Sequence, residues 1–474
     1  MSYKIGSSTV LDVNDSSSNT SVGSFTLSSN TTGIYNTATG KNALEKNTSG
    51  CENTAMGSQA LYCNISGSYN TAVGMSSSRD NTSGSNNTSL GYCSLLLNKE
   101  GFNNTAIGHY ALRFNTGSWN TALGQTALES NLSGGANTAL GQGAMSNNTT
   151  GSNNTAVGLD ALKRITTGNC NCAFGRDALS HTSTNTSSNT AVGFNSLFYT
   201  TGDYNTAVGY GAATQNISGT YNTAIGVNAL SVSVSGGSNT ACGTNALRHK
   251  TDVNGCSAFG TNALYRTTTG YSNTAVGMSS LYRNVTGHQN VAVGHNALVC
   301  VTTGNFNVGI GTGAGTFYDS TIGDLSGFST GSNNVCIGAG SQASRLDVSN
   351  EVSIYNGSVH ARFQGSASSW TFPSDERDKT AIEDLTLGLD FITRLRPRKF
   401  QWNLRHQTEK EGKEASGFIA QEVLALVEAT DSKYTDLVNT SNENQYSLAQ
   451  TNLIPMLVNA IKELTARLEI LEAL

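Results

Sequence analysis

A five-residue motif, Asn-Thr-Ala-aliphatic-Gly, recurs along the first three quarters of the chain and constrains its fold more than any other feature. Most copies lie 17 residues apart, with one-residue slips near residues 120, 189 and 205 and one step of 27 residues before residue 334. The motif Asn lies at positions 19, 36, 53, 70, 87, 104, 120, 137, 154, 171, 189, 205, 222, 239, 273, 290, 307 and 334, and Cys256 replaces it in one copy. A fixed period near 20 residues predicts a solenoid with one structural unit per repeat.

Each repeat carries two apolar sites, and its glycines argue against a helix, which would not tolerate Gly at both ends of every motif. We expect a short strand, a Gly turn and a second short element per repeat. The aliphatic residues are expected to form a thin core and the motif Asn residues an amide ladder. The fourth motif position is apolar at Met56, Val73, Leu90, Ile107, Leu123, Val157, Phe174, Val192, Ile225, Phe259 and Val276. The second apolar site is Leu44, Leu61, Leu112, Leu128, Leu162, Leu230, Leu264 and Leu298.

The repeat resembles the head repeat of trimeric autotransporter adhesins, whose coils carry Asn-Ser-Val-Ala-Ile-Gly and form a left-handed parallel β-roll packed as a trimer. The resemblance covers residues 19–340, with coils about three residues longer here, and similar repeats occur in viral fibres. It implies a mainly β fold, a trimeric parallel β-solenoid. Coils this thin bury little apolar surface alone, so stacking and oligomerisation must supply the rest. Stacking at ~4.8 Å predicts a rod of roughly 90 Å.

Charge and proline divide the chain. The three prolines, Pro373, Pro397 and Pro455, all lie near the C-terminus, and 29 of the Lys, Arg, Asp and Glu residues lie in residues 374–474. Partial alternation of apolar residues from Val352 to Phe372 indicates β structure before that tail. The expected organisation is an N-terminal segment (1–18), a β-solenoid shaft (19–345), a β transition or neck (346–373) and a C-terminal domain (374–474).

The tail resembles the C-terminal intramolecular chaperone domain of phage endosialidases and other viral tail spikes. The matching pieces are Ser374-Asp375-x-Arg377-x-Lys379, Leu395-x-Pro397-x-x-Phe400, Gly417-Phe418-x-Ala420-Gln421-Glu422-Val423, and Tyr446 before a terminal helix. They span about 100 residues in that family's order, at the end of the chain. The resemblance implies an α+β domain that drives trimerisation of the β-fibre before it and then cuts itself off.

Ser374 and Lys379 suit such self-cleavage chemically. A serine hydroxyl attacks a peptide carbonyl when a base removes its proton, and a lysine whose pKa is lowered by burial can be that base. The resemblance assigns Ser374 as nucleophile and Lys379 as base, with cleavage at the Pro373–Ser374 bond. Taken without the family, Ser374-Asp375 is a good helix N-cap. The acidic neighbours Asp375, Glu376 and Asp378 would raise the pKa of Lys379 until assembly buries the site.

The terminal helix carries an apolar seam with 3-4-3-4-3 spacing, the a/d pattern of a coiled coil. The seam residues are Ile454, Leu457, Ile461, Leu464, Leu468 and Leu471. Ile at a with Leu at d fits two or three strands, and the resemblance implies three. The alternative is an amphipathic helix that packs on its own domain. Gln421 is expected on a helix, either between subunits or in a structural role.

Other signals exclude function classes. The net charge of −5 gives no basic footprint for nucleic acid, and no apolar run is long enough to span a membrane. The N-terminus also lacks the apolar core of a secretory signal. The glycine-rich run 309–315 lacks a Lys and the strand–helix setting of a phosphate loop, so no cofactor is expected. Four of the nine cysteines fall within the motif, and His288 and His295 are isolated, so no metal site is expected.

Aromatic residues offer candidate sugar contacts. Tyr69, Trp119, Tyr204 and Tyr221 each precede a motif Asn. The long step before residue 334 contains Phe317, Tyr318 and Phe328, in an insertion that either binds a ligand or fills the end of the shaft. Sequons such as those at Asn47 and Asn64 matter only in a secreted chain.

These patterns lead to one favoured function. The chain is expected to be a viral tail-fibre or tail-spike protein of the virion, made in the host cytoplasm and assembled as a homotrimer. Its partners are expected to be a host-surface glycan or receptor and, through the N-terminus, other virion proteins. The only expected chemistry is a single-turnover Ser/Lys self-cleavage.

Three alternatives remain from the sequence. A polysaccharide-degrading spike needs paired acids, whereas the shaft holds few and scattered ones, such as Asp160, Asp177 and Asp203. A non-viral surface adhesin has the same repeats. An ice- or surface-binding solenoid requires outward rows of Thr and is contradicted if the Thr side chains face the core.

Overall fold

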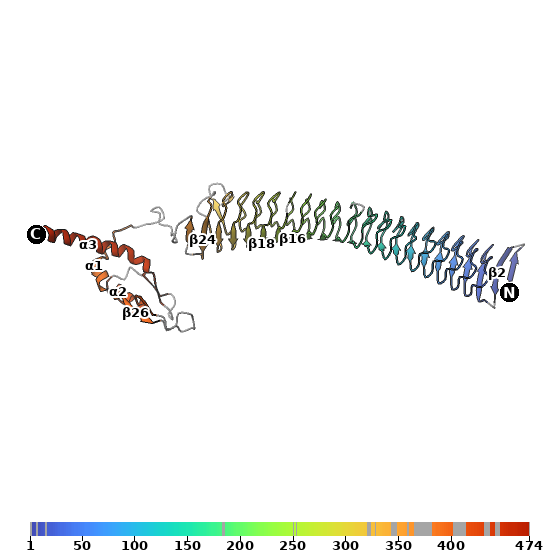
Figure 1. Cartoon of the computed structure of the whole chain (residues 1–474), viewed down its shortest axis with the longest axis horizontal. Coiled ribbons are helices and arrows are strands. Elements are labelled where there is room, and N and C mark those ends of the chain that lie inside the picture. Colours follow the sequence, from blue (N-terminus) through green and yellow to red (C-terminus); the bar gives the residue numbers. More distant parts are fainter. Residues whose placement is uncertain are drawn as a thin grey trace. The chain divides into compact units, whose positions relative to one another are not determined.

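The computed structural model divides into two compact units, residues 1–373 and 374–474 (Figure 1). The structure describes residues 2–473 apart from several short segments and two longer ones. The residues outside the description are 1, 6–7, 15–16, 183–184, 250, 253, 320–323, 328, 343–347, 358–359, 365–381, 402–413, 431–436, 441–445 and 474.

The first unit is a parallel β-solenoid of about 18 turns of ~17 residues, which confirms the predicted fold class. Each coil contributes one three-residue strand, and equivalent residues of successive coils pair in register, as Thr138 pairs with Thr155. The stacked strands are β3 (Asn19–Val22), β4 (Thr37–Thr39), β5 (Thr54–Met56), β6 (Thr71–Val73), β7 (Thr88–Leu90), β8 (Thr105–Ile107), β9 (Thr121–Leu123), β10 (Thr138–Leu140), β11 (Thr155–Val157), β12 (Cys172–Phe174), β13 (Thr190–Val192), β14 (Thr206–Val208), β15 (Thr223–Ile225), β16 (Thr240–Cys242), β17 (Ser257–Phe259), β18 (Thr274–Val276), β19 (Val291–Val293), β20 (Val308–Ile310), β23 (Val335–Ile337) and β24 (Glu351–Tyr355).

The core of each coil lies between the strand and the second element. The middle strand residue and an Ala-Leu pair of the second element point inward and are fully buried, as Ala122, Ala127 and Leu128 show. Ser77 in one coil and Ser89 in the next each replace an inward Ala, and their hydroxyls bond across the core at 2.6 Å. The two elements therefore face each other, and their outward side chains lie on opposite faces of the shaft.

The expectation that the fourth motif position lies in the core is wrong. In a three-residue strand, alternate residues point to opposite faces, so burying the middle Ala sends the residues on either side of it outward. The side chains at the fourth motif position are exposed or half-exposed: Met56, Val73, Leu90, Ile107, Leu123, Val157, Phe174, Val192, Ile225, Phe259 and Val276. The second apolar site, the Leu of the second element, is in the core as expected.

The motif Asn residues form the expected amide ladder. Asn137 donates its backbone N–H to Asn120 Oδ1 at 3.0 Å and its side-chain amide to the carbonyl of Gly151 at 2.8 Å. Its own Oδ1 accepts the backbone N–H of Asn154, so each amide connects consecutive coils. The sequence did not predict a second buried ladder, which includes Asn131 and Asn148 and lies three residues after the core Leu.

The glycine after each strand permits the close stacking of coils. Gly124 has φ +138°, a conformation that L side chains rarely adopt. A Cβ on Gly124 would lie 2.5 Å from the carbonyl oxygen of Gly141 in the next coil. The spacing of the coils therefore depends on the absence of a side chain at this position.

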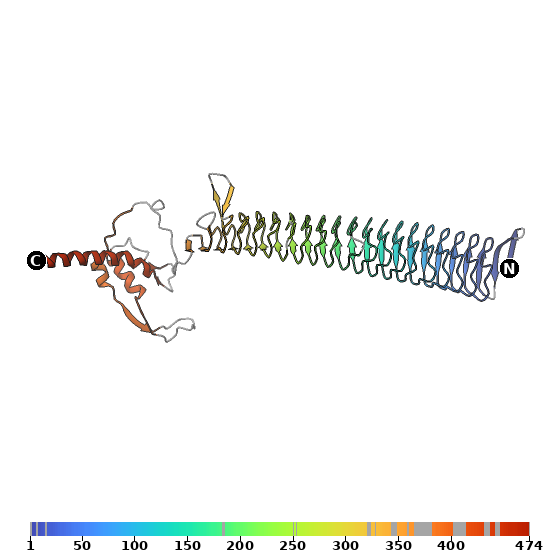
Figure 2. The same cartoon turned by 45° about the horizontal axis from the view of Figure 1, so that its top comes forward.

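Antiparallel hairpins lie at both ends of the stack. β1 (Ser2–Ile5) pairs with β2 (Ser8–Asn14), which pairs antiparallel with β3. At the other end β24 pairs antiparallel with β25 (His360–Gln364). The insertion before residue 334 forms a third hairpin, β21 (Thr316–Asp319) with β22 (Asp324–Gly327), which projects from the stack (Figure 2).

The second unit is a small α+β arrangement. Its elements are α1 (Leu389–Arg394), β26 (Arg398–Gln401), β27 (Glu414–Gly417), α2 (Ala420–Thr430), β28 (Val438–Asn439), β29 (Ser447–Leu448), the 3-10 helix η3 (Gln450–Leu453) and α3 (Ile454–Glu472). Its core is built from Phe391, Val423, Val427, Leu453 and Met456, among others. Within the described part of the chain, no helix combines the length and apolarity that crossing a bilayer requires.

Substitutions at Cys256 and at a motif Asn test how much the Asn ladder contributes to the free energy of unfolding. Its Sγ replaces the amide oxygen and lies 3.5 Å from the N–H of Asn273, a weaker contact than the Asn bonds elsewhere. We expect Cys256→Asn to raise the free energy of unfolding by about 1 kcal/mol, and Asn137→Cys to lower it by about 1–3 kcal/mol by orphaning buried backbone groups. Denaturant midpoints of the two variants and wild type measure this, and shifts of both variants in the same direction would contradict it.

Candidate functional site

The second unit brings together residues from two of the motifs that carried the family resemblance. Leu395 and Pro397 line an apolar groove of about 180 Å³ together with Phe418, Leu453 and Leu457. Two motifs far apart in sequence therefore meet at one surface, beside the start of α3.

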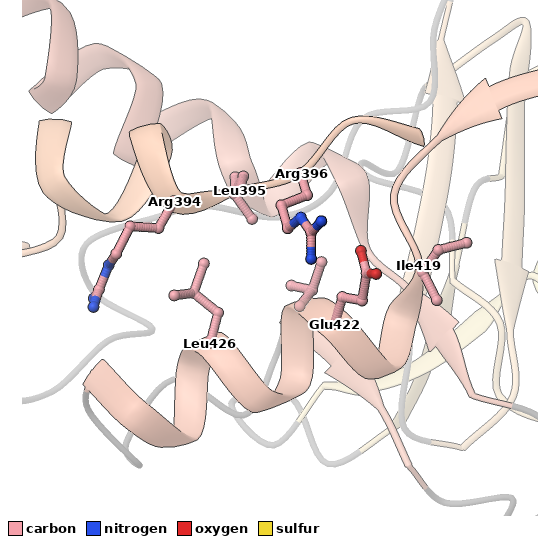
Figure 3. A pocket seen from close by; sticks show the side chains of 7 residues that line it. Arg394, Leu395, Arg396, Ile419, Glu422 and Leu426 are labelled. Atoms are coloured by element: carbon pink, nitrogen blue, oxygen red, sulfur yellow. The ribbon is translucent and has the colours of Figure 1, made fainter. Parts of the chain in front are cut away.

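An ion pair holds the motif that contains Glu422 against the segment that follows Pro397. Arg398 on β26 donates two hydrogen bonds to the Glu422 carboxylate on α2, one of them 3.0 Å from Nε to Oε2. These bonds are the main reason why the pKa of Glu422 is lowered, and they also raise the pKa of Arg398. In the adjoining small pocket the Glu422 carboxylate also points toward the Arg396 side chain (Figure 3). Glu422 is thus held ionised and positions α2.

The helix residues predicted at an interface are on the surface of the chain. Gln421 is exposed on α2, next to Glu422. The predicted seam of α3 is also exposed, from 43% for Leu457 to 69% for Leu471. The seam residues are Ile454, Leu457, Ile461, Leu464, Leu468 and Leu471.

Only the N-terminal part of α3 packs on its own chain. Met456 and Ala460 are buried, and Asn459 donates to the carbonyl of Leu385 at 2.6 Å. Glu463 accepts the N–H of Leu389 at the start of α1. Every described residue from Ile461 onward is exposed. The alternative of an amphipathic helix that packs on its own domain therefore accounts for the buried N-terminal part of α3, and the role of the exposed seam stays a prediction.

Residues 374–431 match the family model described as chaperone of endosialidase, Peptidase_S74. The chaperone of endosialidase domain behind a β-solenoid shaft fits a tail-fibre or tail-spike-like protein. The peptidase designation of the family implies a capacity for self-cleavage. No curated protein and no solved structure matches the chain.

The residues predicted to carry out that cleavage, Pro373, Ser374 and Lys379, lie outside the described residues. Their roles therefore stay predictions from the motif. Within the described part of the chaperone domain, the structure gives the positions of the Arg398–Glu422 pair and of Gln421.

The shaft carries the exposed aromatic side chains that the sequence predicts. Tyr69, Trp119, Tyr204 and Tyr221 are each at least 54% exposed. Tyr204 and Tyr221 stack with ring centroids 4.9 Å apart, in neighbouring coils. The side chains of Phe317, Tyr318 and Phe328 in the insertion lie outside the description.

A groove on the shaft was not predicted from the sequence. It has a volume of about 340 Å³ and is lined by His181, Tyr199, Thr201, Gln215 and Ile217. Partial burial is the main cause that lowers the pKa of His181, so its imidazole is neutral near pH 7. The groove lies where one coil is a residue longer than the 17-residue repeat and the next coil is a residue shorter. This slip in the period is the only sequence signal for the groove. An aromatic ring beside neutral polar groups suits a sugar.

The isolated polar residues fit no catalytic centre. His288 stacks on Tyr271 at 4.6 Å, and His295 is exposed in its coil. Among the described residues, no group of three His, Cys, Asp or Glu side chains is arranged to hold a metal ion. Asp160 and Asp177 occupy equivalent positions in successive coils, but Lys163 pairs with the first and Arg176 with the second. Each of these two carboxylates is therefore engaged by a cationic side chain of the shaft.

The Thr row of the ice- or surface-binding alternative does face outward. The first residue of each three-residue strand is exposed or half-exposed, and it is Thr in most coils. This observation keeps a role for that face open, but the same face also carries the apolar fourth motif position.

Glu422→Gln tests the structural role of the ion pair. A carboxylate with a lowered pKa stabilises the fold above the ordinary Glu pKa of about 4.3, and this stabilisation is lost as the pH falls through the lowered value. We therefore expect the variant to melt below wild type at pH 7, by calorimetry of the full chain, and the difference to shrink as the pH falls below the ordinary Glu pKa. Glu428→Gln, on the exposed face of the same helix, is the control. Equal losses for both variants at pH 7 would contradict the role.

Proposed function

We propose that this chain is a viral tail-fibre or tail-spike protein that forms a homotrimer and attaches the virion to a host-surface glycan or receptor. The observation that supports this most is the match to the chaperone of endosialidase family directly behind a β-solenoid shaft. In this proposal the protein is made in the host cytoplasm and meets other virion proteins through its N-terminus.

The exposed half of α3 supports self-association. An isolated helix of this length is marginal in water, and six apolar side chains along one seam make exposure costly. The seam continues into the apolar groove through Leu457, which belongs to both. Three such helices would bury their seams against one another as a coiled coil.

Self-cleavage uses the serine and lysine of the motif in this proposal. Lys379 takes the proton as Ser374 Oγ attacks the carbonyl carbon of Pro373. The C–N bond breaks, the α-amine of Ser374 receives a proton, and the peptide becomes an ester. Water then hydrolyses the ester, which restores the serine and releases residues 374–474 from the shaft.

The exposed aromatics and the groove beside His181 support attachment to sugars. Tyr199 and the stacked pair Tyr204 and Tyr221 present ring faces along the shaft, and aromatic faces pack well on sugar rings. Thr201 and Gln215 supply hydrogen-bonding groups in the same groove.

The cleavage is tested by mass. Wild type should yield a shaft fragment and a fragment of residues 374–474 on a denaturing gel, whereas Ser374→Ala and Lys379→Ala should stay at 49.4 kDa. Ser369→Ala is the control and should be cut like wild type. N-terminal sequencing of the small fragment should begin at Ser374. A wild type that stays intact, or a Ser374→Ala variant that is still cut, contradicts the mechanism.

The assembly role of α3 is tested by light scattering. Wild type should have the mass of a trimer, and Ile461→Lys with Leu464→Lys should lower it by placing six charges in the seam of three helices. Ala466→Lys puts a charge on the other side of the helix and should leave the trimer intact. A monomeric wild type would overturn the homotrimer, and an unaffected seam variant would overturn the role of α3.

A further inference from the structure

One face of the shaft carries no charge along its whole length. We call it the strand face and define it by the first and third residues of the three-residue strands β4–β20 and β23, with Thr20 and Val22 of β3 and Val352 and Ile354 of β24. Every one of these positions is uncharged. The charged residues of the coils lie elsewhere, as Lys46, Arg113, Lys163 and Arg266 do on the second element.

The two outward columns of the strand face differ in a way that strand propensity does not explain. The first column is mostly Thr, a β-branched residue that suits a solvated strand. The third column is apolar at every coil except those of Thr39 and Cys242, although it is exposed to the same degree. It includes Leu123 and Leu140, which have little preference for strands over Thr. Its apolar character therefore needs a partner.

The apolar column is too large for a free monomer surface. Monomers rarely expose contiguous apolar patches above a few hundred Å². At roughly 50 Å² per side chain, the column offers on the order of 900 Å², comparable with the area that each partner buries in a stable interface.

The periodicity of the column identifies the partner. From β3 to β24 the column presents one apolar side chain per coil, at the spacing of stacked strands, except in the coils of Thr39 and Cys242. Only a partner with the same repeat can match this column along its full length. A second copy of the chain has that repeat, the same absence of charge, and an exposed self-complementary seam at its C-terminus.

We propose that the third column of the strand face is the contact between copies of the chain in the shaft, with parallel coils in register. Three columns meet on one axis, and each coil adds a layer of three apolar side chains between the copies. The inference rests on the proposed homotrimer, and it adds the location of the contact between the shafts of the three copies. It leaves the second-element face, with the groove beside His181 and Tyr199, turned outward.

A native cysteine probes this contact. Cys242 occupies the third column of β16 and is half-exposed in the single chain, whereas Cys170 is exposed beside a motif Asn, off the strand face. In the assembled protein a maleimide should modify Cys170 at least tenfold faster than Cys242, by peptide mapping. Mild oxidation should link two copies through Cys242, and Cys242→Ser should abolish the linked band. Equal labelling without a Cys242 link overturns the proposal.

A pair of charge variants in the same two coils gives the second test. Leu123→Lys with Leu140→Lys places charges on the third column, and Ser130→Lys with Asn147→Lys places them on the opposite face, where other coils carry Lys46 and Arg164. We expect the first pair to expose Cys242 to maleimide and to separate the shafts, and the second to match wild type. If both pairs match wild type, the proposal fails.

The outcomes separate this inference from the homotrimer itself. A trimer by light scattering whose Cys242 is freely labelled and not linked shows that the C-terminal domain alone holds the copies together, and then only the inference fails. A monomeric wild type contradicts both the homotrimer and the strand-face contact. A trimer with protected Cys242 and no effect of the control pair supports both.

Discussion

Nearly every coil of the shaft depends on the carboxamide of one asparagine, which Cys256 replaces in one coil. Its oxygen accepts the backbone N–H of the next motif Asn, and its amide group donates to a glycine carbonyl in a turn, so one side chain satisfies polar groups in two coils. A solenoid turn has more buried backbone than its short strand can pair, and unpaired buried groups are costly. The repeated Asn therefore holds the turn closed and sets the register of the stack.

This constraint explains the composition of the core. Coils in register place identical residues on top of one another, so the interior admits only side chains that fit between identical copies of themselves. Ala and Leu fill it, and glycine at the turn allows carbonyls of adjacent coils to approach. Little apolar surface is left to bury inside, and the larger apolar residues stand outside on the strand. In our proposal the two faces have different roles: the strand face contacts other copies of the chain, and the second-element face contacts ligands.

The period of the repeat predicted the solenoid and its register, because identical residues stack only when coils are equal in length. The sequence could not decide which apolar residue faced inward, since a strand of three residues is too short to show alternation. It also left the second Asn ladder unrecognised, because Asn131 and Asn148 lie in polar stretches that looked like turns. For the chaperone domain, the apolar spacing predicted the seam of α3, whereas the groove arose from contacts between Pro397, Phe418 and Leu457 that no local pattern encodes.

The hairpins at the two ends of the stack have a consequence for length. A parallel stack offers at each end an edge that another coil can extend, which is a route to open-ended filaments. β2 and β25 reverse the direction of pairing, so among the described strands the two ends of the stack are antiparallel and do not offer the parallel template that a further coil would need. The length of the stack between these hairpins then depends on the number of repeats that lie between them. Whole repeats can be gained or lost, and the molecule changes its span without changing its ends.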